Sequence, residues 1–120
     1  MVRLVDISQY ISGHKANIEA EDKRREKFYE EAMIKARYIA QEFVKAYPGV
    51  EVWLFGSLTS DLYELSSDID LAIKGLPEEE YYKALKIAEN IATPIAVDLV
   101  QVEFAPETLR QKIERDGVSL

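Results

Sequence analysis

Apolar positions recur at helical spacing in the first half of the chain. From residue 19 to residue 47 the apolar and small side chains are separated by four, four, three, four and four positions, which is an α-helical period. Charged residues fill the other positions, and Pro48-Gly49 supplies a stop signal. The pattern predicts one amphipathic helix over residues 19–47. Its apolar positions are Phe28, Ala32, Ala36, Ile39, Phe43 and Tyr47.

The first 18 residues are apolar enough to pack against something, but their pattern defines no element. We expect Ser12-Gly13 to interrupt any long helix or strand there. Residues 1–18 are therefore treated as a separate N-terminal segment, and residues 19–120 as one domain.

Short runs of branched and aromatic residues alternate with helical patterns in the rest of the chain. The sequences VEVWLF, DIDLAIK and IAVDLVQV predict strands over residues 50–55, 68–74 and 95–102. Two further helices are predicted over residues 76–92 and 106–116, each with a proline near its start. Gly117 follows the second of them. The predicted order is helix, strand, strand, helix, strand and helix.

Composition and charge limit the possible ligands and the cellular location of the protein. The 120 residues fit one soluble domain, and the absence of a secretory signal and of cysteine favours the cytoplasm. The net charge of −7, from 22 acidic and 15 basic residues, argues against binding long nucleic acids. A single histidine, His14, and no cysteine argue against zinc. Any metal would be a hard cation bound through oxygen.

Carboxylates interrupt two of the predicted strands. Asp68 and Asp70 project from the same face of a strand, with their Cα atoms about 6.6 Å apart. Asp98 lies within the third strand, and it can reach the same place if that strand lies beside the second. Three carboxylates in an apolar sheet repel one another unless cations neutralise them. Mg²⁺ suits such a site, because it binds carboxylate oxygens and leaves positions for phosphate and water.

A Gly-Ser pair ends the first predicted strand. Gly56 has no side chain to block a phosphate, and Ser57 opens a turn that offers a backbone N–H and a hydroxyl. Together with the carboxylates, the pair would hold the two ends of one metal triphosphate. Each signal alone also has a simpler explanation. Asp-x-Asp is a common surface pair, Gly-Ser is a common turn, and Asp98 would be an edge residue facing water.

Together these residues resemble the minimal nucleotidyltransferase (MNT) domains of the DNA polymerase beta superfamily. The shared pattern is Gly56-Ser57, ten residues, Asp68-Ile69-Asp70 and a later Asp98, over roughly residues 30–120. The resemblance implies an α/β (α+β) fold with a small mixed sheet flanked by helices. It also implies two Mg²⁺ ions held by the three aspartates, and transfer of a nucleoside monophosphate, AMP from ATP, to a hydroxyl. Domains of this size often act as antitoxins against HEPN ribonucleases, some of which they adenylylate on a tyrosine.

One segment departs from the pattern of close relatives. They commonly continue Gly-Ser with x-Ala-Arg-Gly, whereas residues 58–61 here are Leu-Thr-Ser-Asp, with no arginine. Lys74, at the end of the second strand, is a candidate for the missing positive charge.

Two hypotheses of different classes follow. The first is a protein adenylyltransferase that modifies a partner of HEPN type. The second is a binding module that keeps the fold and neutralises its partner by contact alone. A small-molecule transferase is a third option, although such enzymes usually carry an extra domain for the acceptor. A single small sheet leaves much of its cleft open, and a homo-oligomer or hetero-oligomer would supply the missing wall of that cleft.

Overall fold

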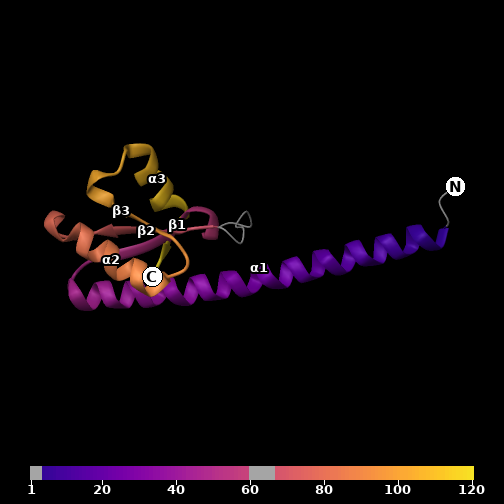
Figure 1. The fold of residues 1–120 in the computed structure, drawn as a ribbon. Helices are drawn as coiled ribbons and strands as arrows, with labels where there is room; N and C mark the ends of the chain where they lie inside the picture. The colour runs from indigo at the N-terminus through magenta and orange to yellow at the C-terminus, as the bar shows by residue number, and fades with distance from the viewer. Residues whose placement is uncertain (1–3, 60–66) are drawn as a thin grey trace.

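The protein has a small mixed β-sheet with helices on both of its faces (Figure 1). The computed structural model describes the backbone of residues 4–59 and 67–120, and the side chains of residues 22–59 and 67–120. The predicted order of helices and strands is confirmed, and a short extra strand follows. The elements are α1 (Leu4–Ala46), β1 (Glu51–Phe55), β2 (Ile69–Lys74), α2 (Tyr81–Ala92), β3 (Val97–Gln101), α3 (Glu107–Asp116) and β4 (Val118–Ser119).

Helix α1 runs for 43 residues and begins earlier than the apolar pattern predicted. The predicted break at Ser12-Gly13 is wrong, because both residues lie inside the helix. An interior glycine costs a helix about 1 kcal/mol relative to alanine, which good helix formers on both sides can outweigh. The N-terminal half of α1 extends beyond the sheet (Figure 1), and the molecule measures 68 × 29 × 19 Å. Neither α1 nor any other described helix is long and apolar enough to cross a membrane.

The described strands form a sheet with the order β3-β2-β1-β4. Strand β2 pairs antiparallel with β1 and parallel with β3, so the predicted mixed sheet is confirmed. Strand β4 pairs antiparallel with the other side of β1. Its two residues, Val118 and Ser119, are too few to show an alternating pattern, which is why the sequence did not predict it.

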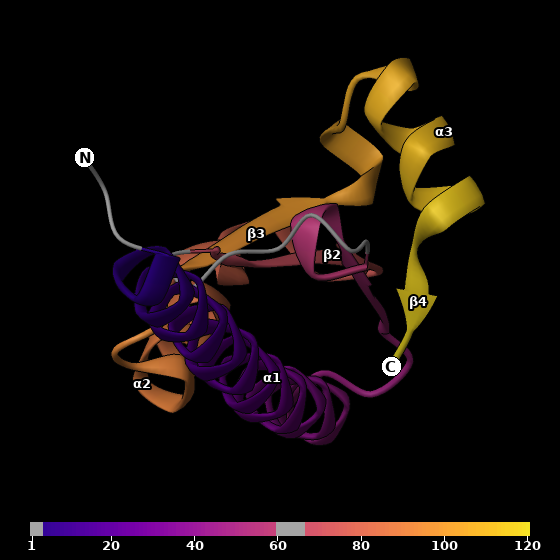
Figure 2. The same ribbon diagram turned by 90° about the vertical axis from the view of Figure 1, so that its right-hand side faces the viewer.

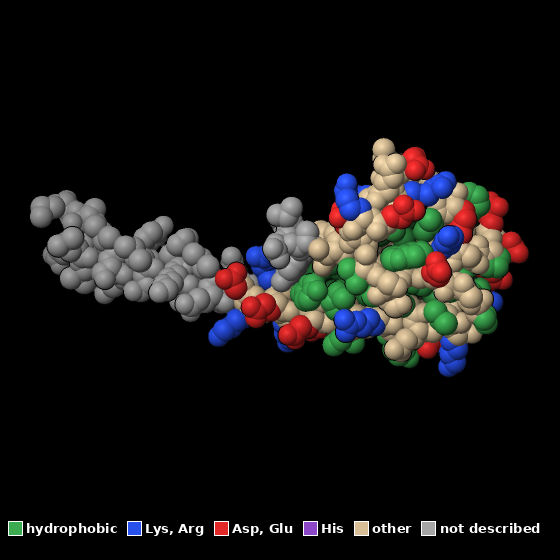
Figure 3. All heavy atoms as spheres, turned by 180° about the vertical axis from the view of Figure 1, so that it is seen from behind, with side chains coloured by type: hydrophobic (Ala, Val, Ile, Leu, Met, Phe, Trp, Pro, Cys, Tyr) green, Lys and Arg blue, Asp and Glu red, His purple; other side chains and the backbone are tan. Residues whose placement is uncertain are grey.

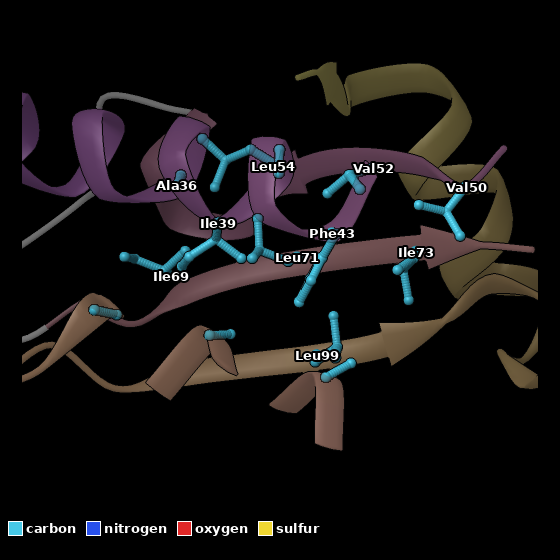
Figure 4. Close-up of a cluster of buried hydrophobic side chains, with 14 of the residues drawn as sticks. Ala36, Ile39, Phe43, Val50, Val52, Leu54, Ile69, Leu71, Ile73 and Leu99 are labelled. Atoms are coloured by element: carbon cyan, nitrogen blue, oxygen red, sulfur yellow. The ribbon is translucent and has the colours of Figure 1, made fainter. Parts of the chain in front are cut away.

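Helices α1 and α2 cover one face of the sheet (Figure 2). Phe43 and Ile39 of α1 lie in one buried cluster with Leu71 of the central strand β2 (Figure 4). Small side chains on the two helices belong to the same cluster, which allows the helices to pack closely. These are Ala32, Ala36 and Ala40 of α1 and Ala84, Ala88 and Ala92 of α2.

Helix α3 covers the opposite face over a smaller cluster. Ile113 of α3 is buried with Phe55 of β1 and Ala72 of β2, and Leu109 packs against them. This face is only partly covered, and Trp53 and Val100 at the edge of this cluster are partly buried.

Phe43 of α1 is fully buried against the sheet. Replacing Phe43 by Ala should lower the free energy of unfolding by about 3–5 kcal/mol, because it leaves a cavity in the core. Replacing its neighbour Val44, which is 48% exposed, by Ala should change it by less than about 0.5 kcal/mol. Urea denaturation of the two variants checks this, and equal losses would contradict the described core.

Candidate active site

The candidate site lies at one end of the sheet, where β1 finishes and where β2 and β3 begin. Phe55, the last residue of β1, is paired with Asp70 of β2. Asp70 is in turn paired with Asp98 of β3. The backbone N–H of Ile69 donates to the carbonyl of Ala96 at 2.9 Å, which ties the starts of β2 and β3 together. This register brings Gly56 and the predicted carboxylates to the same end of the sheet.

The charges of two of the predicted carboxylates, Asp98 and Asp68, act on the third. Burial first, and then the neighbouring charges of Asp98 and Asp68, raise the pKa of Asp70 from 3.8 to about 6. Asp70 is half-buried at the sheet end, whereas Asp68 and Asp98 are exposed. Because β3 pairs directly with β2, the condition inferred from the sequence is met, namely that the third strand lies beside the second.

Gly56 lies directly against the Asp70 carboxylate. Its φ angle is +79°, a conformation that glycine adopts without strain. A Cβ atom added at Gly56 would overlap the Asp70 Oδ2 atom and would lie 2.9 Å from Cγ. From the sequence, the reason inferred for this glycine is room for a phosphate. The structure adds a second reason, which is room for the carboxylate itself.

Gly56 also begins the predicted turn, a single 3₁₀ turn over Gly56–Thr59. The Thr59 Oγ1 atom donates to the Gly56 carbonyl at 2.7 Å and closes the turn, while Leu58 is buried beneath it. Ser57 is therefore held in a fixed turn next to Asp70. The sequence did not single out Thr59, although a threonine three residues after a turn glycine suits this bond. Ser60 and Asp61 lie outside the described residues.

Two lysines differ in their relation to the carboxylates. Lys74, the predicted cofactor-binding lysine, ends β2 four residues after Asp70, so their Cα atoms are about 13 Å apart. The structure thus places Lys74 at the opposite end of the strand. Lys112 of α3 lies close enough to Asp70 for its positive charge to lower the pKa of that carboxyl. The sequence missed Lys112, because a lysine on an amphipathic helix is usually only a solvated residue.

The oxygen atoms of the three aspartates suit a hard cation such as Mg²⁺, and they offer no soft ligand. Within residues 22–59 and 67–120, no group of three or more His, Asp or Glu side chains is already close enough to hold a metal ion. Asp98 and Asp68 repel the charge of Asp70, and a bound cation would relieve this repulsion. The electrostatics of the three aspartates therefore agree with a role as cation ligands.

The raised pKa of Asp70 predicts a pH-dependent stability of the metal-free protein. Protonated Asp70 contributes stability that is fully present below its ordinary pKa of 3.8 and is lost as pH rises through about 6. Asp70→Asn removes the charge. In EDTA at pH 7.5 the variant should be more stable than the wild type by about 1–2 kcal/mol, after allowance for solvent screening.

At pH 4 this difference should shrink toward zero, and urea denaturation at both pH values measures it. Glu114→Gln on the exposed side of α3 is the control and should change stability little at either pH. An equal effect of Asp70→Asn at both pH values would contradict the raised pKa.

Comparisons with known proteins agree with this geometry. Residues 39–120 match the family described as Polymerase beta, Nucleotidyltransferase. A search of curated proteins found no match. A chain of a toxin–antitoxin complex with AMP-PNP is 23% identical with a TM-score of 0.57, over 68% of this chain and 69% of that one. A chain from a complex of tri-AMPylated Shewanella oneidensis HEPN toxin with MNT antitoxin is 22% identical with a TM-score of 0.56, over 73% and 70%.

At such identities the solved structures show a common fold. The family match is the stronger finding, since it spans more than half of the chain and includes Gly56-Ser57 and all three aspartates. The resemblance inferred from the sequence motif is therefore confirmed, and the chain belongs to the polymerase beta nucleotidyltransferase family.

Proposed function

We propose that this protein is a Mg²⁺-dependent nucleotidyltransferase that transfers AMP from ATP to a hydroxyl of a partner protein. The observation that carries the proposal is the meeting of Asp68, Asp70 and Asp98 with the Gly56–Thr59 turn at one end of the sheet. Phosphoryl-type transfer requires carboxylates that bind metal ions and, beside them, a turn that binds phosphate.

Each residue has a distinct role in this proposal. Asp68, Asp70 and Asp98 would hold the two Mg²⁺ ions, which supply charge neutralisation and a lower pKa of the attacking hydroxyl. Gly56 and Ser57 would seat the triphosphate. The acceptor oxygen bonds to the α-phosphorus, the bond from this phosphorus to the pyrophosphate oxygen breaks, and Asp98 accepts the hydroxyl proton. Asp98 is exposed, so an incoming acceptor could reach its carboxylate.

The partner is proposed to be a toxin of HEPN type, with this chain as its antitoxin. Support comes from two structures that share the fold, a toxin–antitoxin with AMP-PNP and a complex containing a tri-AMPylated HEPN toxin. Both concern other proteins, so the acceptor of this chain needs its own test.

The second function, neutralisation by contact alone, is favoured by a different observation. Helix α1 extends far beyond the sheet it covers, which gives the protein a long surface for a helical partner (Figure 1). The departure from x-Ala-Arg-Gly after Gly56-Ser57 points the same way.

Replacing Asp70 by Asn should abolish transfer of label from α-³²P-ATP to the partner, because it removes the central carboxylate of the site. Circular dichroism should show an unchanged fold, and γ-labelled ATP should give no labelled protein in either case. Transfer that survives in the variant would disprove the assignment. A variant that no longer transfers but still neutralises the partner would establish the binding-only function.

The two lysines give a matched pair for the triphosphate. Lys112→Ala should weaken binding of Mg-ATP about fivefold, since one exposed cation contributes up to about 1 kcal/mol. Lys74→Ala, at the far end of β2, should change the Kd by less than about twofold. Isothermal titration calorimetry of both variants measures this. If Lys74→Ala weakened binding more than Lys112→Ala, the prediction would be wrong, and Lys74 would be the phosphate-binding lysine, as the sequence suggested.

A further inference from the structure

Asp98 lies on β3, a strand at one edge of the described sheet. Strand β3 pairs on one side with β2, and no described strand lies on its other side. The Asp98 side chain is exposed, so few neighbours restrict its movement. A group that binds a metal ion or takes a proton must stay within about 0.5 Å of its working position. The position of Asp98 therefore depends on what fixes the backbone of β3.

One backbone carbonyl of β3 points to the free edge of the sheet, directly after Asp98. The Ala96 carbonyl, just before β3, accepts a hydrogen bond from the Ile69 N–H of β2 at 2.9 Å. Backbone groups point alternately to the two sides along a strand, so the Leu99 carbonyl, three residues later, points away from β2. Leu99 is buried, and a buried carbonyl needs a hydrogen-bond partner. That partner must come from outside the sheet.

Tyr81, the first residue of α2, supplies the partner. Its hydroxyl donates to the Leu99 carbonyl at 2.7 Å, which is an ordinary length for a bond between two oxygen atoms. The Tyr81 ring packs against the core cluster on the α1 and α2 face, and Leu99 belongs to that cluster. Side chains alternate along a strand, so Asp98 faces the opposite side of the sheet. Tyr81 therefore holds the β3 backbone without entering the site itself.

An electrostatic effect agrees with the short path from the Tyr81 hydroxyl to Asp98. Burial first, and then the charge of Asp98, raise the pKa of Tyr81. The two groups are thus near enough to interact through the strand. The carbonyl that Tyr81 binds belongs to the residue directly after Asp98. Any shift of the Leu99 peptide therefore also shifts the Asp98 backbone and the carboxylate that it carries.

We propose that Tyr81 is a positioning residue of the candidate active site, which fixes the free edge of β3 and thereby holds the Asp98 carboxylate beside Asp70. The inference rests on the proposed function, in which Asp98 is a metal ligand and a proton acceptor. It adds to that function a residue from the other face of the sheet, which touches neither metal nor nucleotide and acts only through the β3 backbone.

The test replaces Tyr81 by Phe, which keeps the ring and its packing and removes only the hydroxyl. Mg²⁺ alone is titrated into the full chain at pH 7.5. Acidic side chains are also spread over the rest of the surface, as Figure 3 shows for one face, and they would contribute to any bulk signal. Binding is therefore followed in ¹⁵N–¹H spectra at the amides of Asp70 and Asp98. Tyr81→Phe should raise the Kd of Mg²⁺ about tenfold, the lower end of the effect of a residue that orients a metal ligand.

Two further variants separate positioning from stability. Tyr47→Phe removes a comparable bond at the start of α2, because the Tyr47 hydroxyl donates to the Glu80 Oε2 atom at 3.2 Å. It should lower the urea midpoint as Tyr81→Phe does, but change the Kd of Mg²⁺ by less than about twofold. Asp98→Asn should raise that Kd about tenfold or more. Adding Tyr81→Phe to Asp98→Asn should raise it by less than about twofold again, because the carboxylate that Tyr81 positions is already gone.

The outcomes distinguish the positioning role from the proposed metal site. If Asp98→Asn weakens Mg²⁺ binding and Tyr81→Phe does not, the positioning role is overturned and the metal site stands. An equal loss in Tyr47→Phe, or a full second loss in the Asp98→Asn background, also overturns it, because the effect then reflects stability or another residue. If Asp98→Asn binds Mg²⁺ like the wild type, or the wild type shows no saturable shift, the metal role of Asp98 is overturned together with this inference.

Discussion

The site depends on one packing constraint, the contact between the Asp70 carboxylate and the backbone of Gly56. Strand register places Asp70 beside the end of β1, and any Cβ atom at Gly56 would occupy the space of this carboxylate. The same register places Asp98 beside Asp70. Burial and these neighbours raise the pKa of Asp70 to about 6, so the protein keeps a costly charge at the end of its sheet. A group that weakens the metal-free fold in this way is expected where function rather than stability has selected the residue.

Most of the fold could be predicted because it rests on local periodicity. The helical spacing of Ala32, Ala36, Ile39 and Phe43 and the branched runs of the strands are visible in the sequence. The four helix residues are buried as expected, and the strands contribute buried residues such as Leu54, Leu71 and Leu99. Two features of the fold were not predicted correctly. Ser12-Gly13 looked like a break, yet the helix passes through it, and β4 is too short to have a pattern. Propensity ranks the residues of a helix, but it does not by itself decide where a long helix begins.

The site was predictable to the extent that its residues are close in the sequence or have a distinctive spacing. Gly56, Asp68 and Asp70 fall within one short stretch, and Asp98 stands out as a carboxylate between apolar neighbours. The lysine that lies near the carboxylates was not predictable. Lys74 is near Asp70 in sequence but lies along the strand away from it, whereas Lys112 arrives from α3, which packs over the same face through Ile113. Contacts of that kind exist only once the helix has been placed on the sheet.

The balance of charge at the site explains why cations are part of the proposed function. Three carboxylates and a nearby lysine leave the end of the sheet negative, in a protein whose net charge is already −7. A triphosphate brings further negative charge, and the backbone N–H groups of one short turn cannot neutralise it. Close relatives commonly place an arginine after Gly-Ser, but residues 58–61 here contain none. In the proposed function, more of the neutralising charge would therefore come from bound cations and from Lys112. The site would then depend more on Mg²⁺ than one with the arginine in place.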